Sequence, residues 1–311
     1  MAAASRGRQF ILTGCAAAAV TLTVGACSGG SGSHPAATTA TSGTSALAGA
    51  APFRSAFASP SSKVTPINRL TGPPADPFAG TPADHWADGA AGIVVPAARA
   101  HGSFAAAKVH DAEETTQKLL VAAYLDRQTL LGGAPTAFEK LLTNQQRAEF
   151  VKDLDSTGVR KDGSSLSTRI MVTSFAPGSA NLIGSVIKVQ GTMSARAGTD
   201  RGSTVLYISV NYLFVYPLEP PHLPEDWMRV VGHTYGTVEF GDWAQASTPF
   251  EPWVQVETAH AGVKCSARDG YVHPDFPNGP PDSVSPTGTP VDPYSQSTAG
   301  STAGCQPTTG T

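Results

Sequence analysis

The run TVLYISVNYLFVY at residues 204–216 decides the fold of this chain. Successive side chains of a β-strand point to opposite faces, and this run divides between two such faces. One face carries Leu206, Ile208, Val210, Tyr212 and Phe214, and the other carries Val205, Tyr207, Ser209, Asn211 and Leu213. Because β-branched and aromatic residues favour strands, the run predicts a long strand with a large apolar face.

Four further runs alternate in the same way, and we expect them to be strands of the same sheet. They cover residues 169–175, 182–193 with breaks at Gly184 and Gly191, 228–240, and 253–258. Turn-forming residues lie between them at Pro177-Gly178 and at residues 197–202. The connection 217–224 is rich in proline, so we expect it to cross the surface.

The region before these strands has helical periodicity. Ser103 is a candidate N-cap for a helix over residues 104–126. Its expected inward face consists of Ala105, Val109, Ala112, Thr116, Leu119, Leu120 and Ala123, and its solvent side carries Glu113, Glu114, Gln117 and Lys118. A second helix is expected after Pro135, with an interruption at Asn144-Gln145 before helical character resumes over residues 147–154.

Helices followed by about five strands indicate an α+β fold, with the helices packed on one face of a curved antiparallel sheet. We expect this domain to cover residues 84–264. The order of elements over residues 103–260 resembles the nuclear-transport-factor-2-like and cystatin-like cones, in which a curved sheet wraps a helix. That resemblance implies an inward-facing pocket, for which Tyr212, His233, Tyr235 and Glu239 are candidates. The alternative is that the aromatic rings simply fill the mouth of the cone.

The N-terminus has the pattern of an export signal: Arg6 and Arg8 precede an apolar run over residues 10–24. The run ends at Val24-Gly25-Ala26-Cys27, which resembles a lipobox. The resemblance implies removal of residues 1–26 and a diacylglyceryl group on Cys27. The sequence Leu12-Thr13-Gly14-Cys15 has a similar pattern, but its apolar lead-in is too short. An ordinary cleaved signal is the remaining alternative.

The segment 27–83 is dominated by Ser, Gly, Ala, Thr and Pro, so it reads as a flexible tether between the lipid and the domain. The net charge is −3 without a basic stripe, which argues against nucleic acid as a partner. No apolar stretch of membrane-spanning length follows the signal. These features predict a protein held on the outer face of the cell membrane by its lipid.

Setting Cys15 and Cys27 aside leaves Cys265 and Cys305 as a pair in an oxidising compartment. We expect them to form a disulfide that closes the irregular tail, residues 265–311, which is rich in proline and glycine. The alternative is two free thiols.

Three short patterns resemble functional motifs but are incomplete. The segment Gly232 to Gly236 has Thr234 where a nucleophile elbow needs serine. A calcium-loop-like start at Asp153 lacks the glutamate at its twelfth position. A metal site could draw on His260, Asp269, His273 and Asp275, although a packed turn explains this segment better. We therefore expect no catalytic residues, no metal and no cofactor.

Several runs are similar to a group of actinobacterial surface lipoproteins that has no assigned activity. They are residues 86–96 (WADGAAGIVVP), 119–126 (LLVAAYLD), 135–138 (PTAF), 212–217 (YLFVYP), 269–274 (DGYVHP) and 292–294 (DPY). The resemblance implies the cell envelope as the location and leaves the chemistry open.

Together these observations favour a non-enzymatic, lipid-anchored envelope protein that binds or scaffolds an envelope protein or cell-wall component. Two alternatives remain: a cone-shaped domain that binds or transforms a small ligand, and a solute-binding lipoprotein associated with a transporter.

Overall fold

The computed structural model describes residues 72–161, 165–200, 202–242, 249–297 and 305–309. These residues all belong to one compact unit, which spans residues 64–311. The expected signal, Cys27 and most of the expected tether lie outside the described residues. Within the described ranges, no helix combines the length and the apolar character needed to cross a bilayer.

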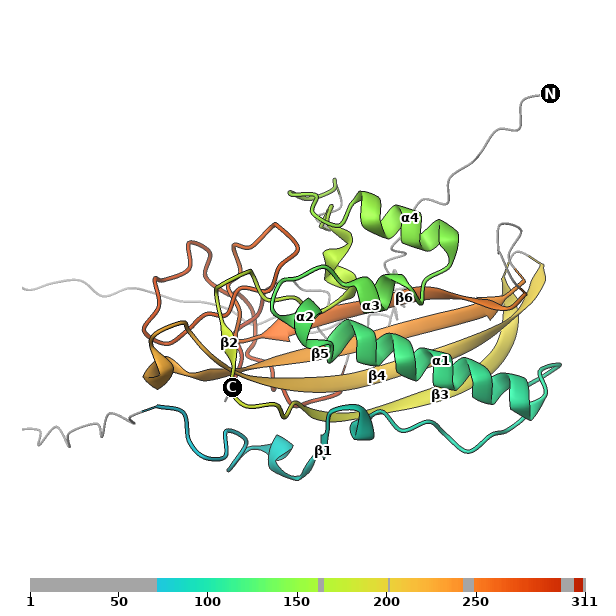
Figure 1. Ribbon diagram of the computed structural model, residues 1–311, viewed down its shortest axis with the longest axis horizontal. Helices are drawn as coiled ribbons and strands as arrows, with labels where there is room; N and C mark the ends of the chain where they lie inside the picture. Colours follow the sequence, from blue (N-terminus) through green and yellow to red (C-terminus); the bar gives the residue numbers. More distant parts are fainter. Residues whose placement is uncertain (1–71, 162–164, 201, 243–248, 298–304, 310–311) are drawn as a thin grey trace, which may run out of the picture. The chain divides into compact units, whose positions relative to one another are not determined.

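A single antiparallel sheet organises the domain (Figure 1). Its strands are β1 (Ala87–Asp88), β2 (Asn181–Leu182), β3 (Lys188–Asp200), β4 (Ser203–Glu219), β5 (Met228–Gly241) and β6 (Glu251–Ala261). Neighbouring strands follow the order β1-β3-β4-β5-β6, and β2 pairs with the end of β4. The predicted α+β fold is therefore confirmed, with six strands in the described part of the chain.

Strand β4 lies in the middle of this order, and most of its side chains are buried, on both faces of the sheet. It pairs with β3 from Lys188↔Val215 to Asp200↔Ser203 and with β5 from Leu206↔Phe240 to Leu218↔Met228. Gly191 of β3 lies opposite Tyr212, whose ring occupies the space that a Cβ at position 191 would need. Gly191, where a break was predicted, thus lies inside a continuous strand, and its missing side chain leaves room for the Tyr212 ring.

The helices lie on one face of the sheet (Figure 1). They are α1 (Ala106–Tyr124), α2 (Arg127–Leu130), α3 (Thr136–Glu139) and α4 (Asn144–Lys152). Short 3-10 turns cover η1 (Pro82–His85), η2 (Gly89–Gly92), η3 (Thr168–Met171) and η4 (Pro224–Asp226). Ser103 is not the N-cap of α1, because His101 and Phe104 form a backbone-paired turn and Ala105 takes the cap position.

The strand predicted over residues 169–175 does not form. Its first residues belong to η3, and Phe175 makes only an isolated bridge to Val272. The alternation there is not an inside–outside pattern, because the polar Arg169, Thr173 and Ser174 are buried whereas the apolar Ile170 is exposed. Arg169 donates to Asp155 at 2.6 Å and lies 4.2 Å from the Tyr271 ring. Arg169 is thus a buried, hydrogen-bonded residue of the η3 turn and not part of a strand.

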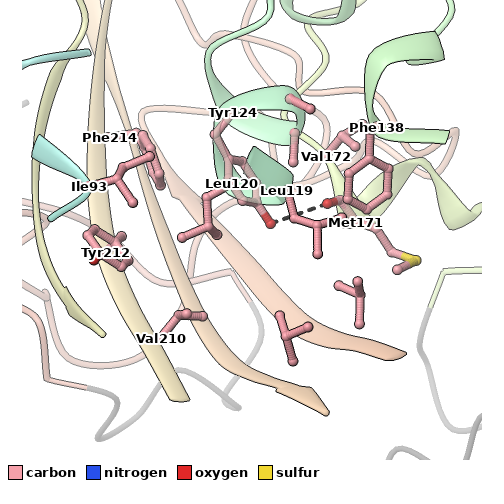
Figure 2. Close-up of a cluster of buried hydrophobic side chains, with 14 of the residues drawn as sticks. Ile93, Leu119, Leu120, Tyr124, Phe138, Met171, Val172, Val210, Tyr212 and Phe214 are labelled. Atoms are coloured by element: carbon pink, nitrogen blue, oxygen red, sulfur yellow. Dashed lines mark hydrogen bonds between the residues drawn. The ribbon is translucent and has the colours of Figure 1, made fainter. Parts of the chain in front are cut away.

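Aromatic side chains from β4 fill the core between the sheet and the helices (Figure 2). Tyr124 at the end of α1 lies 5.0 Å from the Phe214 ring. Its hydroxyl donates to the Met171 carbonyl at 3.2 Å and accepts from Thr258 at 3.1 Å, so its polar end is satisfied inside the core. The inward stripe predicted for α1 is buried apart from Ala105.

Glu113 is a correction to the predicted solvent face of α1. Its side chain is only 3% exposed, and its Oε2 has no hydrogen-bond partner among the described residues. Burial raises the pKa of the Glu113 carboxyl, and the nearby charges of His110 and His101 oppose that shift. The chain between η2 and α1 covers this side of the helix, as the bond from Gln117 Nε2 to the Ile93 carbonyl at 2.6 Å shows.

A second, smaller apolar cluster lies on the opposite face of the sheet. It consists of Phe78, Ala83, Leu213, Val215 and Val231, with Trp86, Val186, Ala261 and Tyr294 packed against it. Phe78 and Ala83 belong to the segment assigned to the tether, so the folded domain begins before residue 84. Phe78 was the only large apolar residue near the end of that segment, and the sheet face supplies the partner that buries it.

Candidate functional site

The C-terminal tail is fastened to the outer face of the sheet at several points. Cys265 and Cys305 form the predicted disulfide, with their Cα atoms 5.6 Å apart. Buried Asp226 in η4 accepts from the backbone N–H of Asn278 at 3.0 Å and from its side chain at 2.7 Å. Asp282 accepts from the backbone N–H groups of Cys265 and Ser266. These bonds hold the proline-rich tail in a defined path without regular secondary structure.

The tail also bonds directly to the central strand. The Asn211 side chain donates to the Gln296 carbonyl at 3.0 Å, and the Gln296 side chain donates to the Asn211 carbonyl at 3.0 Å. Nearby, the Tyr294 ring packs edge-on against Trp86 at 5.9 Å. This reciprocal pair connects residues 85 positions apart in sequence.

A cleft of about 670 Å³ lies between the tail and the sheet. Its lining comes from β5 (Met228, Val231, His233), the end of β6 (Ala259, His260, Ala261), and tail segments around Asp275, Asp282, Asp292 and Pro307. Both disulfide cysteines are part of the lining. Clefts of this volume are typical of small-ligand or peptide-segment sites, so we take this one as the candidate functional site.

The hydrogen bonds of Asn211 fix the protonation of His233. Because the Asn211 Nδ2 donates to a carbonyl, its Oδ1 faces the His233 Nε2 at 2.8 Å, and an amide oxygen can only accept. The imidazole therefore carries its proton on Nε2 and keeps Nδ1 as an acceptor. Burial lowers the pKa of His233 below its usual value of 6.5, which favours this neutral form.

The three residues proposed for ligand binding do not form one site. Tyr212 is fully buried on the helix-facing side of the sheet, and burial raises its pKa to about 12. His233 and Tyr235 lie on the opposite face, with their rings 5.2 Å apart. Only His233 lines the cleft, whereas the Tyr235 hydroxyl donates to Glu257 at 2.9 Å on an exposed part of the sheet. Glu239 pairs with Trp253 across β5 and β6, away from the cleft lining.

The residues considered for a metal site are distributed over different contacts. His260 bonds to Thr173 at 3.0 Å, and His273 pairs with Asp269 at 2.9 Å. Asp155 of the calcium-like loop pairs with Arg169 instead. Among the described residues, no group of three or more His, Cys, Asp or Glu side chains is arranged to hold a metal ion.

The sequence patterns do not single out two residues beside the cleft, Asn211 and Gln296. The sequence does contain a signal for Asn211, because its side-chain amide lies in the middle of the apolar run 204–216. A polar residue at such a position needs a hydrogen-bond partner when it is covered. Nothing in the sequence of the tail singles out Gln296 as that partner, since the pairing depends on where the disulfide and the Asp282 bonds place it.

The fold and the cleft define an α+β domain with a disulfide-closed tail packed on the outer face of its sheet. No family model matches the chain, and neither a curated protein nor a solved structure matches it.

Proposed function

We propose that this chain is a lipid-anchored cell-envelope protein whose domain is a non-enzymatic binding or scaffolding module. The lipid on Cys27 would hold it on the outer face of the cell membrane, and the cleft beneath the tail would bind an extracytoplasmic partner or ligand. The observation that carries the proposal is the cleft itself, built from one rigid sheet face and a tail clamped by the disulfide and by side-chain bonds.

The contacts of the polar groups around the cleft support a preformed binding surface. The His233 Nε2 is held by Asn211, and the His260 Nε2 is in contact with the Thr173 hydroxyl. Asp282 accepts from the backbone of Cys265 and Ser266. Groups held in this way give the cleft a wall that is formed before a ligand arrives, which favours binding.

The test uses the full chain in cells with a photo-crosslinking residue at Ala259, which is exposed on β6 and lines the cleft. The matched control places the same group at Gln255, which is exposed on the same face of the same strand but outside the cleft lining. We expect a defined crosslinked adduct from position 259 alone. The molecule captured in this adduct should bind the purified protein and should not bind the Ala259→Trp variant. Equal labelling from both positions would overturn the cleft as the binding site.

The anchoring part is tested separately. We expect the native chain to fractionate with membranes and to incorporate a lipid label, and Cys27→Ser to lose both properties. A Cys27→Ser protein that retains the label would contradict the lipid assignment.

A further inference from the structure

The charged side chains that line the cleft are mostly acidic. Among the described residues that line the cleft, Asp275, Asp282 and Asp292 are acidic and Arg229 is the one cationic residue. The two lining histidines, His233 and His260, both have pKa values lowered by burial and are neutral at pH 7. The lining therefore carries an excess of negative charge.

The cationic groups near the cleft have other contacts. The Arg229 Nε donates to the Pro77 carbonyl, and its guanidinium lies 4.9 Å from the Trp227 ring. Lys264 donates to the Pro280 carbonyl at 3.0 Å and Arg268 to the Cys265 carbonyl at 2.7 Å. Lys264 and Arg268 line a separate hollow of about 330 Å³ with Asp269 and His273, so their charges are not presented in the main cleft.

The cleft lining also offers several hydrogen-bond acceptors, beside the side chains of Ser295, Gln306 and Thr308, which can both donate and accept. The bonds of Asn211 leave the His233 Nδ1 as an acceptor. An ionised carboxylate offers acceptors and no donor, and the hydrogen bonds from the Ser266 side chain and from the backbone N–H groups of Val284, Cys265 and Ser266 lower the pKa of the Asp282 carboxyl below its ordinary value. The prolines at 277, 286, 293 and 307 in the lining have no N–H to donate. An occupant that donates hydrogen bonds and carries positive charge complements this surface.

We propose that the cleft binds primary ammonium groups on a flexible aliphatic chain, as carried by lysine side chains of a peptide or by a free polyamine. This inference rests on the proposed binding function and names its ligand class. The anionic walls would attract the cation, and the apolar floor formed by Val231, Ala259 and Ala261 would contact its methylene groups.

The experiment measures affinity by titrating the purified full chain, in a non-ionic detergent, with three probes. They are a short peptide of alternating lysine and glycine, the same peptide with glutamate in place of lysine, and spermidine. We expect the lysine peptide to bind, the glutamate peptide not to bind, and affinity to fall as salt rises. If spermidine binds as tightly as the lysine peptide does, a free polyamine is the source of the ammonium group. If spermidine binds more weakly than the lysine peptide, the source is a peptide.

Substitutions locate the binding. Asp275→Asn and Asp292→Asn should each lower the affinity for the lysine peptide by roughly threefold to tenfold. The Asp292→Asn variant keeps a side-chain oxygen that can accept from the Tyr294 N–H. Asp111→Asn on the exposed face of α1 is the control and should change nothing. Ala259→Lys should abolish binding by charge repulsion and Gln255→Lys should not, with unchanged thermal unfolding as the check on folding.

The outcomes separate this inference from the proposed function. Failure of both cationic probes to bind, or equal binding of the glutamate peptide, overturns the ammonium assignment. If position 259 nevertheless yields its specific adduct in cells, the binding function stands with a different ligand class. If it does not, both proposals fall.

Discussion

The side-chain amide of Gln146 forms both hydrogen bonds that a neighbouring strand would make with Val254. Its Nε2 donates to the Val254 carbonyl at 2.7 Å, and its Oε1 accepts from the Val254 N–H at 3.0 Å. Gln146 lies on α4, is fully buried, and sits 108 residues away in sequence. It therefore covers part of the outer edge of β6 and satisfies backbone groups that would otherwise remain unpaired.

Gln146→Ala should destabilise the domain because both Val254 groups lose a buried partner. We expect the free energy of unfolding to fall by about 2–4 kcal/mol. Urea denaturation measures this change. The control is Gln145→Ala, which removes a hydrogen bond to Glu149 on the same helix and should cost about 0.5 kcal/mol. Equal losses from the two variants would contradict the edge-capping role.

Tyr124 and Tyr212 give a matched pair of buried hydroxyls. The Tyr124 hydroxyl bonds to Met171 and Thr258, whereas the Tyr212 hydroxyl has no partner among the described residues. We expect Tyr124→Phe to lower the free energy of unfolding by about 1–2 kcal/mol and Tyr212→Phe to leave it unchanged or raise it. Thermal and urea denaturation compare the two. A large loss from Tyr212→Phe would show that its hydroxyl is satisfied in solution.

Glu113 should make stability depend on pH. Burial raises the pKa of its carboxyl above 4.5, so the folded state holds a proton more tightly than the unfolded state does. Its contribution to stability is therefore complete below pH 4.5 and is lost as the pH rises through the folded-state pKa. Glu113→Gln should stabilise the protein at pH 7 by about 1 kcal/mol, with the gain disappearing in acid. Glu114→Gln, on the half-exposed side of α1, is the control.

His260 should act in the opposite direction on the acid side. Burial lowers the pKa of its imidazole to about 4, from an ordinary value of 6.5. Between these values the unfolded state binds more protons, so the free energy of unfolding decreases as pH falls from about 6.5 to about 4. Stability curves against pH should lose this slope in His260→Gln and retain it in His85→Gln, whose side chain is exposed. An unchanged slope in His260→Gln would refute the assignment.

The disulfide should control both stability and the cleft. Cys265 and Cys305 are separated by 40 residues, for which the loop-entropy relation gives about 4 kcal/mol. We expect Cys305→Ser to lose a large part of this stabilisation and to weaken any binding in the cleft, because the tail wall is released. Mass spectrometry after alkylation without reductant should find neither cysteine modified in the native chain. Alkylation of both would refute the closed tail.

Local sequence patterns predicted the strands and helices that have a clear hydrophobic periodicity of their own. The run 204–216 became β4, and the apolar stripe over residues 104–126 became α1, because alternation and the helical repeat are properties of neighbouring residues. The disulfide was also predictable, since the cysteine count left one pair. The strand predicted over residues 169–175 was wrong because the polar Arg169, Thr173 and Ser174 are buried whereas Ile170 is exposed, so the alternation does not separate a buried face from a solvent face.

The residues of the candidate site were predictable only in part, because the cleft is assembled from segments far apart in the chain. His233 was predicted as a ligand-binding residue and does line the cleft. Tyr212 lies opposite Thr234, the neighbour of His233, and adjacent residues of a strand point to opposite faces. Tyr212 therefore faces the other side of the sheet. Asn211 pairs with Gln296 only after the tail has been folded back onto the sheet.

The sequence by itself therefore determined the α+β class, the long central strand, the main helix and the cysteine pair. The burial of Glu113, the cap of Gln146 on β6, the neutral tautomer of His233 and the acidic cleft were decided by tertiary structure alone. The physical reason is the range of the interactions. Periodicity is written in adjacent residues, whereas burial, hydrogen-bond partners and the sign of a cleft depend on side chains that meet only when distant segments pack together.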